Sequence, residues 1–401
     1  MNKNYLKKLL EGVEVEWKAL GEVADYEQPT KYLVKSTNYN DNFPLPVLTA
    51  GKTFILGYTD ETKGIYKASE TPVIIFDDFT TANKWVDFDF KAKSSAMKMI
   101  TSKDESKALL KYIYYWLNTV PSGLVDGDHK RQWISNYSNK LIPIPPLSVQ
   151  KEIVRILDTF TELTAELTAE LTARKRQYSF YREELLDFSD QLLDFSDQLL
   201  VDSGQRKVEW KTLGNIAKIQ RGASPRPIAK FITEDKNGVS WIKIGDTLPN
   251  SKYVSATKQK ITSEGAKKSR ILKKGDFIIS NSMSFGRPYI LDIDGAIHDG
   301  WASISEFGEK LNSDYLYHYL ASNIVQNFWL SKINSGSVSN LNADIIKSLQ
   351  IPIPPLEEQE RIVSILDKFD TLTSSISEGL PKEIELRQKQ YEYYRNELLS
   401  F

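Results

Sequence analysis

The tripeptide Gly-Lys-Thr at residues 51–53 ends the segment PVLTAGKTF and has the residue types that close a phosphate-binding loop. Downstream, VIIFDD places Asp77 and Asp78 after an apolar run, where a carboxylate could hold magnesium. Two details argue against this chemistry. The first glycine of such a loop would stand at Pro46, and TFILGYT is typical of a strand rather than of a helix whose amides cradle phosphate. Nucleotide hydrolysis by a phosphate-loop enzyme is therefore only a remote alternative.

Other catalytic centres lack the residues that they need. The three histidines, His129, His298 and His318, have no paired spacing for zinc, and the chain contains no cysteine. There is no glycine-rich dinucleotide turn after a strand, no nucleophile elbow, and no Asn-Pro-Pro-Phe or Asp-Pro-Pro-Tyr tetrad for amino-methyl transfer. We expect the remaining candidates to be solvated loop carboxylates: Asp77, Asp78, Asp126 and Asp128. We therefore expect no catalytic residue and no bound metal or cofactor on this chain.

Charge is distributed unevenly along the chain. The 401 residues, enough for two to four domains, have a net charge of only -1, which excludes a uniformly basic coat. Residues 218–286 nevertheless carry 14 Lys and Arg against 5 Asp and Glu, whereas residues 148–200 carry 6 against 11. The basic segment indicates an anionic partner, or simply a solvated lysine-rich surface. No apolar run approaches the roughly 20 residues of a membrane span, and no signal peptide is evident, so we expect a cytoplasmic protein that contacts no membrane.

The chain contains an internal repeat. VEWKALGEVA at 15–24 returns as VEWKTLGNIA at 208–217, and IPIPPLSVQKEIVRILDTF at 142–160 returns as IPIPPLEEQERIVSILDKF. RQYSFYREELLDF at 176–188 returns as KQYEYYRNELLSF at the end of the sequence. We call these repeated segments the frame. Two unlike inserts lie between them, module 1 (25–141) and module 2 (218–350), so the repeat predicts one scaffold that carries two different modules.

Apolar spacing in the frame predicts helices. The stripe in the first copy is Ile153, Ile156, Leu157 and Phe160, and in the second copy Ile362, Ile365, Leu366 and Phe369. We expect the first helix to run unbroken to about residue 200, and the second to break near Gly379 and Pro381. Burying one stripe against the other predicts a pair of antiparallel helices. The alternative is two independent helices, each covering its own insert.

The predicted fold class is α/β, of the α+β type. Short β-branched runs and amphipathic helices indicate two globular mixed α/β modules, joined by two long antiparallel helices that form a coiled-coil-like spacer with an internal pseudo-twofold repeat. The predicted domains are the N-terminal segment 1–24, module 1 at 25–141, the central helix at 142–200, a linker at 201–217 that repeats the N-terminal segment, module 2 at 218–350 and the distal helix at 351–401.

Each insert is followed by Ile-Pro-Ile-Pro-Pro-Leu, a glutamine at 150 or 359, an Ile-Val-x-Ile-Leu-Asp helix and a QYxxYRxxLL segment. Across essentially the whole chain, this series resembles the specificity subunit of type I restriction-modification systems. The resemblance implies that each module is a target recognition domain for one half of a split site in double-stranded DNA. It also implies that the helices separate the modules and dock two methyltransferase subunits, through which restriction subunits join. Catalysis, S-adenosylmethionine, ATP and magnesium would then belong to those partner subunits.

The segment LTAELTAELTA at 163–173 resembles the repeats whose number sets the gap between half-sites in this family. A four-residue unit adds about 6 Å of helix, and base pairs are spaced about 3.4 Å apart, so one unit would shift a module by about one or two base pairs. The duplicated DFSDQLL at 187–200 departs from the family pattern. A purely structural adaptor, which joins protein partners without discriminating DNA sequences, is the other reading of these helices.

Contacts to DNA need cations for phosphates and planar or amide groups for base edges. We select such residues mainly from polar and glycine-bearing loops; for each, the alternative is an ordinary surface position. The candidates in module 1 are Lys31, Lys52, Lys84, His129, Lys130, Arg131 and Trp133. The candidates in module 2 are Arg221, Arg226, Asn281, Ser284, Arg287, Ser337 and Asn340.

Overall fold

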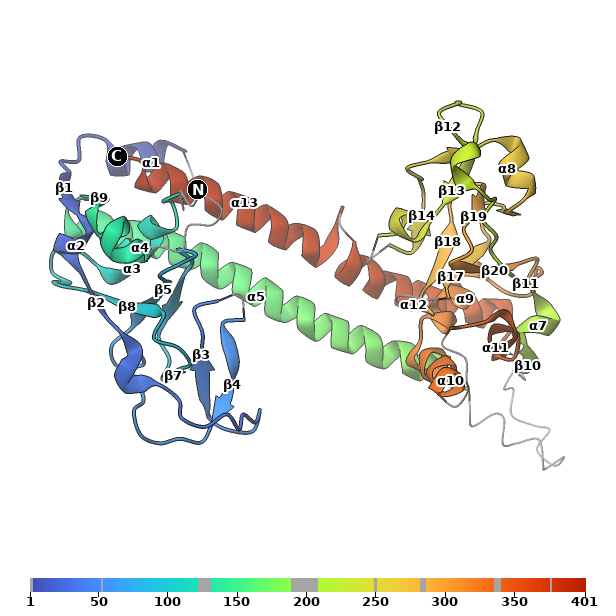
Figure 1. Cartoon of the computed structure of the whole chain (residues 1–401), viewed down its shortest axis with the longest axis horizontal. Coiled ribbons are helices and arrows are strands. Elements are labelled where there is room, and N and C mark those ends of the chain that lie inside the picture. The colour runs from blue at the N-terminus through green and yellow to red at the C-terminus, as the bar shows by residue number, and fades with distance from the viewer. Residues whose placement is uncertain are drawn as a thin grey trace. The chain divides into compact units, whose positions relative to one another are not determined.

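The computed structural model describes residues 3–51, 53–121, 131–188, 208–248, 251–281, 286–334, 340–375 and 377–401. The chain divides into two compact units. Unit 1 comprises Met1–Glu166 with Glu385–Phe401, and unit 2 comprises Leu167–Ile384. Each unit contains one module together with parts of both long helical segments (Figure 1). Among the described residues, no helix is long and apolar enough to cross a membrane.

The frame builds the same two-stranded ribbon in each unit. In unit 1, β1 (Glu16–Ala19) pairs antiparallel with β9 (Leu141–Ile144); in unit 2, β10 (Glu209–Thr212) pairs antiparallel with β21 (Gln350–Ile353). The register is also the same, because the first residue of the earlier strand lies opposite the last residue of the later one. The ribbon therefore closes each module at its base by joining the chain that enters it to the chain that leaves it.

A buried glutamine fixes the start of each long helix. Gln150 has no exposed surface; its Oε1 accepts from the Leu109 N–H at 2.9 Å, and its Nε2 donates to the carbonyls of Lys107 and Pro145 at 2.8 Å. Gln359 makes the same three kinds of bond at the equivalent positions of unit 2. Because buried backbone groups must find partners, these bonds orient the helix relative to the module above it.

Module 1 has two small sheets. A four-stranded sheet has the order β2-β8-β5-β6, and a three-stranded sheet has the order β4-β3-β7. The strands are β2 (Ala24–Glu27), β3 (Leu45–Leu48), β4 (Ile55–Thr59), β5 (Val73–Asp77), β6 (Asn83–Val86), β7 (Lys91–Ala92) and β8 (Met97–Ser102). The α-helices of unit 1, apart from the long ones, are α1 (Lys3–Leu10), α2 (Leu20–Val23), α3 (Leu110–Leu117) and α4 (Gln132–Ser135). All five residues of β5 are buried, so this strand forms the centre of the module.

Module 2 has two five-stranded sheets, of order β11-β20-β17-β18-β14 and β12-β15-β13-β19-β16. The strands are β11 (Lys218–Arg221), β12 (Ile232–Thr233), β13 (Val239–Ile242), β14 (Tyr253–Val254), β15 (Lys260–Ile261), β16 (Arg270–Leu272), β17 (Phe277–Ser280), β18 (Pro288–Leu291), β19 (Gly295–Ile297) and β20 (Trp301–Ser305). The helices are α7 (Leu213–Ile216), α8 (Ser263–Lys267), α9 (Ser313–Leu320), α10 (Asn323–Asn334) and α11 (Ala343–Lys347). The fully buried β17 takes the central place that β5 has in module 1.

The long helices are α5 (Leu147–Leu186), α12 (Leu356–Ser374) and α13 (Gly379–Leu399). The predicted break at Gly379 is confirmed: this residue has φ +78°, and a Cβ there would lie 2.5 Å from the Thr371 carbonyl oxygen. The predicted continuation of the first helix to about residue 200 is wrong. The helix ends at Leu186, a side chain buried in the core of unit 2, and residues 189–207 lie outside the described part of the chain.

The two helical segments pack against each other within each unit. In unit 1, Phe160 of α5 stacks on Tyr394 of α13 with ring centroids 5.1 Å apart. In unit 2, Phe369 of α12 stacks on Tyr178 and Tyr181 of α5, at 6.1 and 5.6 Å. The start of α5 thus meets the end of α13, and the end of α5 meets α12, which confirms the predicted antiparallel pair and rules out independent helices.

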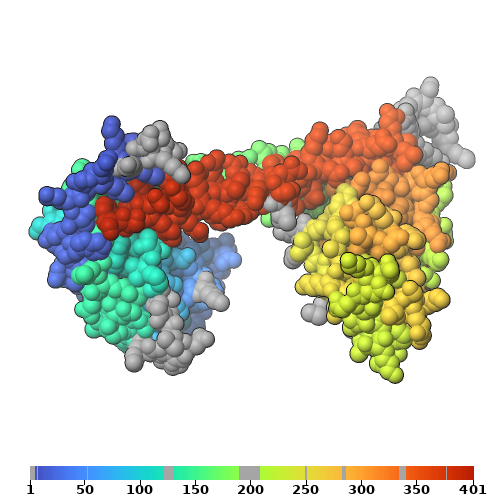
Figure 2. Space-filling model, turned by 90° about the horizontal axis from the view of Figure 1, so that it is seen from above, coloured from blue at the N-terminus to red at the C-terminus, as the bar shows by residue number. Residues whose placement is uncertain are grey.

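The two ends of the chain meet in unit 1. Figure 2 shows the last turns of α13, in dark red, lying against the N-terminal segment in dark blue. Leu6 of α1 and Leu398 and Leu399 of α13 belong to one apolar core, together with Ile153 and Leu157 of α5. The distal frame segment therefore completes the core under module 1, while the end of α5 contributes Leu186 to the core under module 2.

Candidate nucleic-acid interface

A polar residue follows the central strand of each module and binds the returning chain. Asp78 follows β5, and its carbonyl oxygen accepts from the Gln132 N–H at 2.8 Å. Asn281 follows β17, and its carbonyl oxygen accepts from the Leu341 N–H at 3.1 Å. We call these places the return junctions. They hold the end of each polar loop at equivalent positions of the two repeats. The backbone of the loop residue just before each junction is therefore held at a defined place on the module.

A buried ion pair lies at the return junction of module 1. Asp78 and Lys98 are each 1% exposed, and Lys98 Nζ lies 3.6 Å from the Asp78 carboxylate and 4.5 Å from the centre of the Tyr26 ring. The other Asp78 carboxylate oxygen accepts from the Trp133 N–H at 2.8 Å. The expectation that Asp78 is a solvated loop carboxylate is therefore wrong, because the returning loop covers the strand end and excludes water.

Asp77 also departs from that expectation. Its side chain is 7% exposed, and one carboxylate oxygen accepts from the N–H groups of Phe79 and Thr80 at 2.9 and 3.2 Å. A short acidic side chain of this kind stabilises a turn by satisfying backbone donors. Asp77 is therefore a turn residue. Asp126 and Asp128 lie outside the described residues.

Trp133 is a core residue rather than a contact residue. It is 2% exposed, and its ring packs edge-on against Phe76 and Tyr26, with centroids 5.4 and 6.3 Å apart. This burial corrects the expectation that Trp133 touches DNA. The Trp133 side chain instead packs in the core and holds the end of the loop against the module. Arg131, two residues earlier, remains exposed directly before α4. The loop is thus held by Trp133 while Arg131 faces solvent.

The other candidates in module 1 are dispersed. Lys31 is exposed and forms an ion pair with Glu27 at 3.0 Å, and Lys84 is exposed on β6 at the edge of the four-stranded sheet. Among the described residues, neither lysine side chain forms a hydrogen bond or an ion pair with the return junction. Three further candidates lie outside the described residues: Lys52, His129 and Lys130.

Gly51 and Thr53 lie between the two strands of a hairpin, and Lys52 lies outside the described residues. β3 and β4 on either side of the turn pair antiparallel, and the Thr49 N–H donates to the Phe54 carbonyl at 2.8 Å across the turn. The predicted strand after the tripeptide is confirmed. Because a strand follows, the turn lacks the helix N-terminus whose amides and dipole bind phosphate in a nucleotide hydrolase.

In module 2, the sequence-predicted residues converge on a loop that was not predicted. Asp299 lies between β19 and β20; its carboxylate accepts from Ser224 Oγ at 2.8 Å and lies 3.4 Å from Arg226 Nη2. Its backbone carbonyl accepts from Arg221 Nε at 3.3 Å and from Asn281 Nδ2 at 3.1 Å. We call these residues, with His298, the Asp299 cluster. Three of the predicted candidates, which are far apart in sequence, therefore meet at one place beside the return junction.

Electrostatics keep the Asp299 carboxylate charged. Partial burial alone would raise its pKa, but the Ser224 hydroxyl, His298 and Arg226 together hold that pKa below its usual value. His298 Nδ1 accepts from the Gly300 N–H at 2.9 Å, so its proton is on Nε2, which lies 3.0 Å from the Asp299 carboxylate. The cluster thus combines one anionic group with two guanidinium groups and one imidazole.

Gly222 permits the close approach on which the cluster depends. A Cβ at this position would lie 2.0 Å from the His298 carbonyl oxygen, a distance that no side chain tolerates. The Gly222 N–H instead donates to the Trp301 carbonyl at 2.8 Å. The glycine in QRGASPRP therefore lets Arg221 and Ser224 lie against the 298–300 loop.

The remaining candidates in module 2 have different environments. Asn281 is only 7% exposed, so its side chain acts through Asp299 and is not itself presented to a ligand. Arg287 is half-buried with its guanidinium 5.3 Å from the Tyr289 ring centre, and Asn340 is exposed just before the return junction, the place that Arg131 takes in module 1. Ser284 and Ser337 lie outside the described residues.

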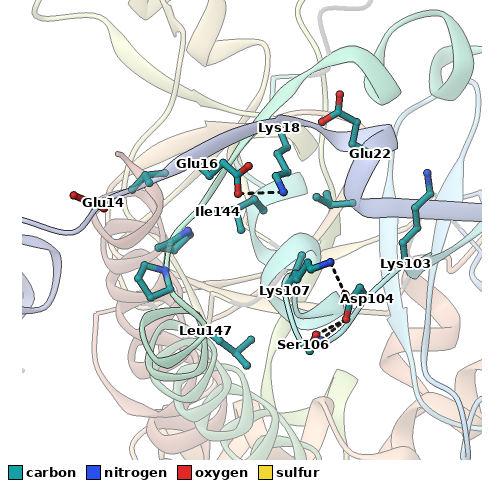
Figure 3. Close-up of a pocket in the computed structure, with 15 residues that line it drawn as sticks. Glu14, Glu16, Lys18, Glu22, Lys103, Asp104, Ser106, Lys107, Ile144 and Leu147 are labelled. Atoms are coloured by element: carbon teal, nitrogen blue, oxygen red, sulfur yellow. Dashed lines mark hydrogen bonds and ion pairs between the residues drawn. The ribbon is translucent and has the colours of Figure 1, made fainter.

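A cavity lies on the frame of unit 1. It has a volume of about 820 Å³ and is lined by β1, α2, residues 103–108 and the Pro-Pro-Leu start of α5. Figure 3 shows Lys18 reaching Glu16 and Lys107 reaching Asp104, both at 3.1 Å. Each of these two lysines therefore has an acidic partner within the lining of the cavity. Within the described ranges, no group of three or more His, Asp or Glu side chains could hold a metal ion.

Two unlike α/β modules on a duplicated frame, each with a loop fixed at a return junction, define the class of protein by its architecture. Comparison with known proteins then identifies the family. The model of the type I restriction modification DNA specificity domain matches residues 12–174 and 205–386. The chain belongs to this family of type I restriction-modification specificity subunits, as its motifs predicted.

Two relatives match this chain over nearly all of their length. The chain is 51% identical to the type I restriction enzyme EcoR124I/EcoR124II specificity subunit of Escherichia coli, over 99% of this chain and 97% of that protein. It is 34% identical to a putative type I restriction enzyme specificity subunit of Haemophilus influenzae, over 100% of this chain and 99% of the relative.

Solved structures share the fold. The specificity (S) subunit of a type I system from M. genitalium aligns with a TM-score of 0.57 at 15% identity, over 98% of this chain and 97% of that chain. A chain from a type I restriction-modification complex also gives 0.57, at 19% identity, over 96% and 97%. At these identities the likeness concerns the fold alone, and it confirms the predicted pair of α/β modules on long helices.

Proposed function

We propose that this chain recognises a bipartite sequence in double-stranded DNA, with one half-site bound by each module and an unread gap between them. One observation carries the proposal: the two return junctions are equivalent in backbone but different in side chains. Asp78 and the exposed Arg131 stand in module 1 where Asn281 and the exposed Asn340 stand in module 2. A frame that presents two unlike sets of side chains suits two different base sequences.

The charges near the junctions support DNA as the ligand. Arg131 is exposed beside the junction of module 1, and Arg221 and Arg226 are exposed in the Asp299 cluster of module 2. Exposed guanidinium groups bind phosphates and the O6 and N7 atoms of guanine. Arg131, Arg221 and Arg226 are therefore the described residues that we assign to DNA contact, with Asn340 as an amide that suits a base edge.

We further propose that the chain is non-catalytic and acts by recruiting partner subunits. Two methyltransferase subunits would dock on the duplicated frame, and restriction subunits would join through them. The two units have equivalent ribbons and equivalent aromatic stacks between their long helices. This likeness supports the stoichiometry, because two like surfaces can bind two copies of one partner. S-adenosylmethionine, ATP and magnesium would be bound by those partners, which supply methylation and cleavage.

The test is selection from random DNA by the chain in complex with its methyltransferase subunit. Bound duplexes are recovered, amplified and sequenced over several rounds. The proposal predicts enrichment of two short sequence blocks at one fixed separation. Strong binding without any enriched sequence would instead favour a structural adaptor, and one continuous enriched block would contradict the two-module assignment.

A further inference from the structure

The Asp299 cluster places a carboxylate among the cations that would bind DNA in module 2. Asp299 lies 3.4 Å from Arg226 through its side chain and accepts from Arg221 through its backbone carbonyl. It also holds Ser224 and lies 3.0 Å from His298. An acidic group at the centre of a DNA-binding surface repels phosphate, so its presence there needs a reason.

Stability does not supply that reason. The Arg226 side chain is 83% exposed, and ion pairs of such exposure contribute little to folding because water and salt screen them. The 298–300 loop is also held without the Asp299 carboxylate. The Gly222 N–H donates to the Trp301 carbonyl, and the Asn281 N–H donates to the Gly300 carbonyl. The carboxylate is therefore in a position to restrain Arg226, and the backbone carbonyl of the same residue to restrain Arg221, without the carboxylate being needed to build the fold.

We propose that Asp299 is a specificity-determining positioning residue of module 2, which holds Arg226 and Arg221 away from indiscriminate phosphate contacts. A free arginine binds any DNA backbone, and binding of that kind carries no sequence information. With Asp299 as a competing partner, the guanidinium groups leave the cluster only when the correct half-site offers them better acceptors. Discrimination between sequences thus comes partly from a penalty on the wrong ones. This inference rests on the proposed function.

The test compares Asp299→Asn with Asp292→Asn in the full chain complexed with its methyltransferase subunit. Asparagine keeps an oxygen that accepts from Ser224 but removes the charge. Asp292 is a matched control, because it is an aspartate of the same module that pairs with the exposed Lys274. Affinities are measured for the selected DNA, for DNA altered in the module 2 half-site and for unrelated DNA, at several salt concentrations.

The proposal predicts that Asp299→Asn binds altered and unrelated DNA about two- to fivefold more tightly than the Asp292→Asn control does, the factor expected for loss of one exposed ion pair. The slope of log affinity against log salt on unrelated DNA should steepen by about 0.9, the contribution of one more neutralised phosphate. Preference for the correct module 2 half-site falls accordingly, whereas discrimination at the module 1 half-site stays unchanged.

Other outcomes overturn it. Equal loss of binding to all DNA with a lowered melting temperature would give Asp299 a structural role. Loss of binding to the selected DNA alone would mean that the carboxylate itself contacts a base, and affinities equal to those of Asp292→Asn would mean that it does nothing. A wild-type complex that shows no preference among sequences would count against the proposed function instead, and so separates the two failures.

Discussion

At the residue scale, the two modules solve one structural problem with different side chains. The chain that returns from each recognition loop must be fixed to the end of the central strand. Module 1 does this with Asp78, whose carbonyl and carboxylate accept from the Gln132 and Trp133 N–H groups, and module 2 does it with Asn281, whose carbonyl accepts from the Leu341 N–H. The residues next to these anchors, Arg131 and Asn340, are the exposed ones. Unlike side chains are therefore exposed at equivalent positions of the two modules.

Replacing Arg131 by alanine should impair one half-site only. The guanidinium is exposed just before α4, so its loss removes one bidentate donor and should cost about 1–3 kcal/mol of discrimination, which is about a 5- to 150-fold loss of preference. Methylation of DNA libraries randomised in one half-site at a time measures this preference. Asn340→Ala, at the equivalent position of module 2, is the matched variant and should affect the other half-site. An equal loss at both half-sites from either change would mean general backbone binding.

Replacing Gln150 by alanine should destabilise the protein by about 2–4 kcal/mol, because it removes the partner of the Leu109 N–H and of the Lys107 and Pro145 carbonyls in a largely buried place. Gln359→Ala should act similarly in unit 2. Urea unfolding of the full chain, followed by circular dichroism, measures the change in the free energy of unfolding that each variant causes. Gln177→Ala, on the partly exposed face of α5, is the control and should cost less than about 0.5 kcal/mol. A Gln150 variant as stable as that control would show that the helix start is fixed by other contacts.

At the element scale, periodic patterns were predictable and long-range contacts were not. The sequence predicted the long helices, the break at Gly379 and the strand after Gly-Lys-Thr, because helical spacing, glycine, proline and β-branched runs act locally. The burial of Trp133 and the Asp78–Lys98 pair depend on which strands become neighbours, and no local pattern contains that information. For the same reason Asp299 was missed. Arg221, Arg226 and Asn281 were selected singly, and only the strand order brings them together.

The repeats in α5 have a regular burial pattern that suits a change of length in whole units. Leu163, Leu167 and Leu171 are partly buried, whereas Glu166 and Glu170 are exposed. The Thr164 hydroxyl donates to the Phe160 carbonyl four residues back at 2.8 Å, so the threonines are satisfied within the helix. Each TAEL unit thus adds about one helical turn and one partly buried leucine.

Deleting residues 164–167 should shorten the unread gap by about one or two base pairs while both half-sites keep their sequences. Selection of bound DNA by the deletion variant in complex with its methyltransferase measures the gap directly. Glu166→Gln changes the same unit without changing its length and should leave the gap as it is. An unaltered gap in the deletion variant would mean that α5 does not set the separation.

At the scale of the whole molecule, one frame is used twice. Each unit has the same ribbon register, the same buried glutamine and the same aromatic stack between helices, although the modules above them have different sheets. On the proposed function, the shared frame would carry the docking sites for partners, and each module would determine one half of the recognised sequence. The family membership and the geometry therefore lead to the same account of the protein.

The measurement that tests this account most directly is long-read modification sequencing of DNA from cells that express the chain with its methyltransferase subunit. The account predicts one bipartite motif, with a methylated adenine in each half and a single fixed gap. Methylation at a continuous motif, or at no consistent motif despite an active methyltransferase, would contradict the central claim that two modules on one frame recognise the two halves of a split DNA site.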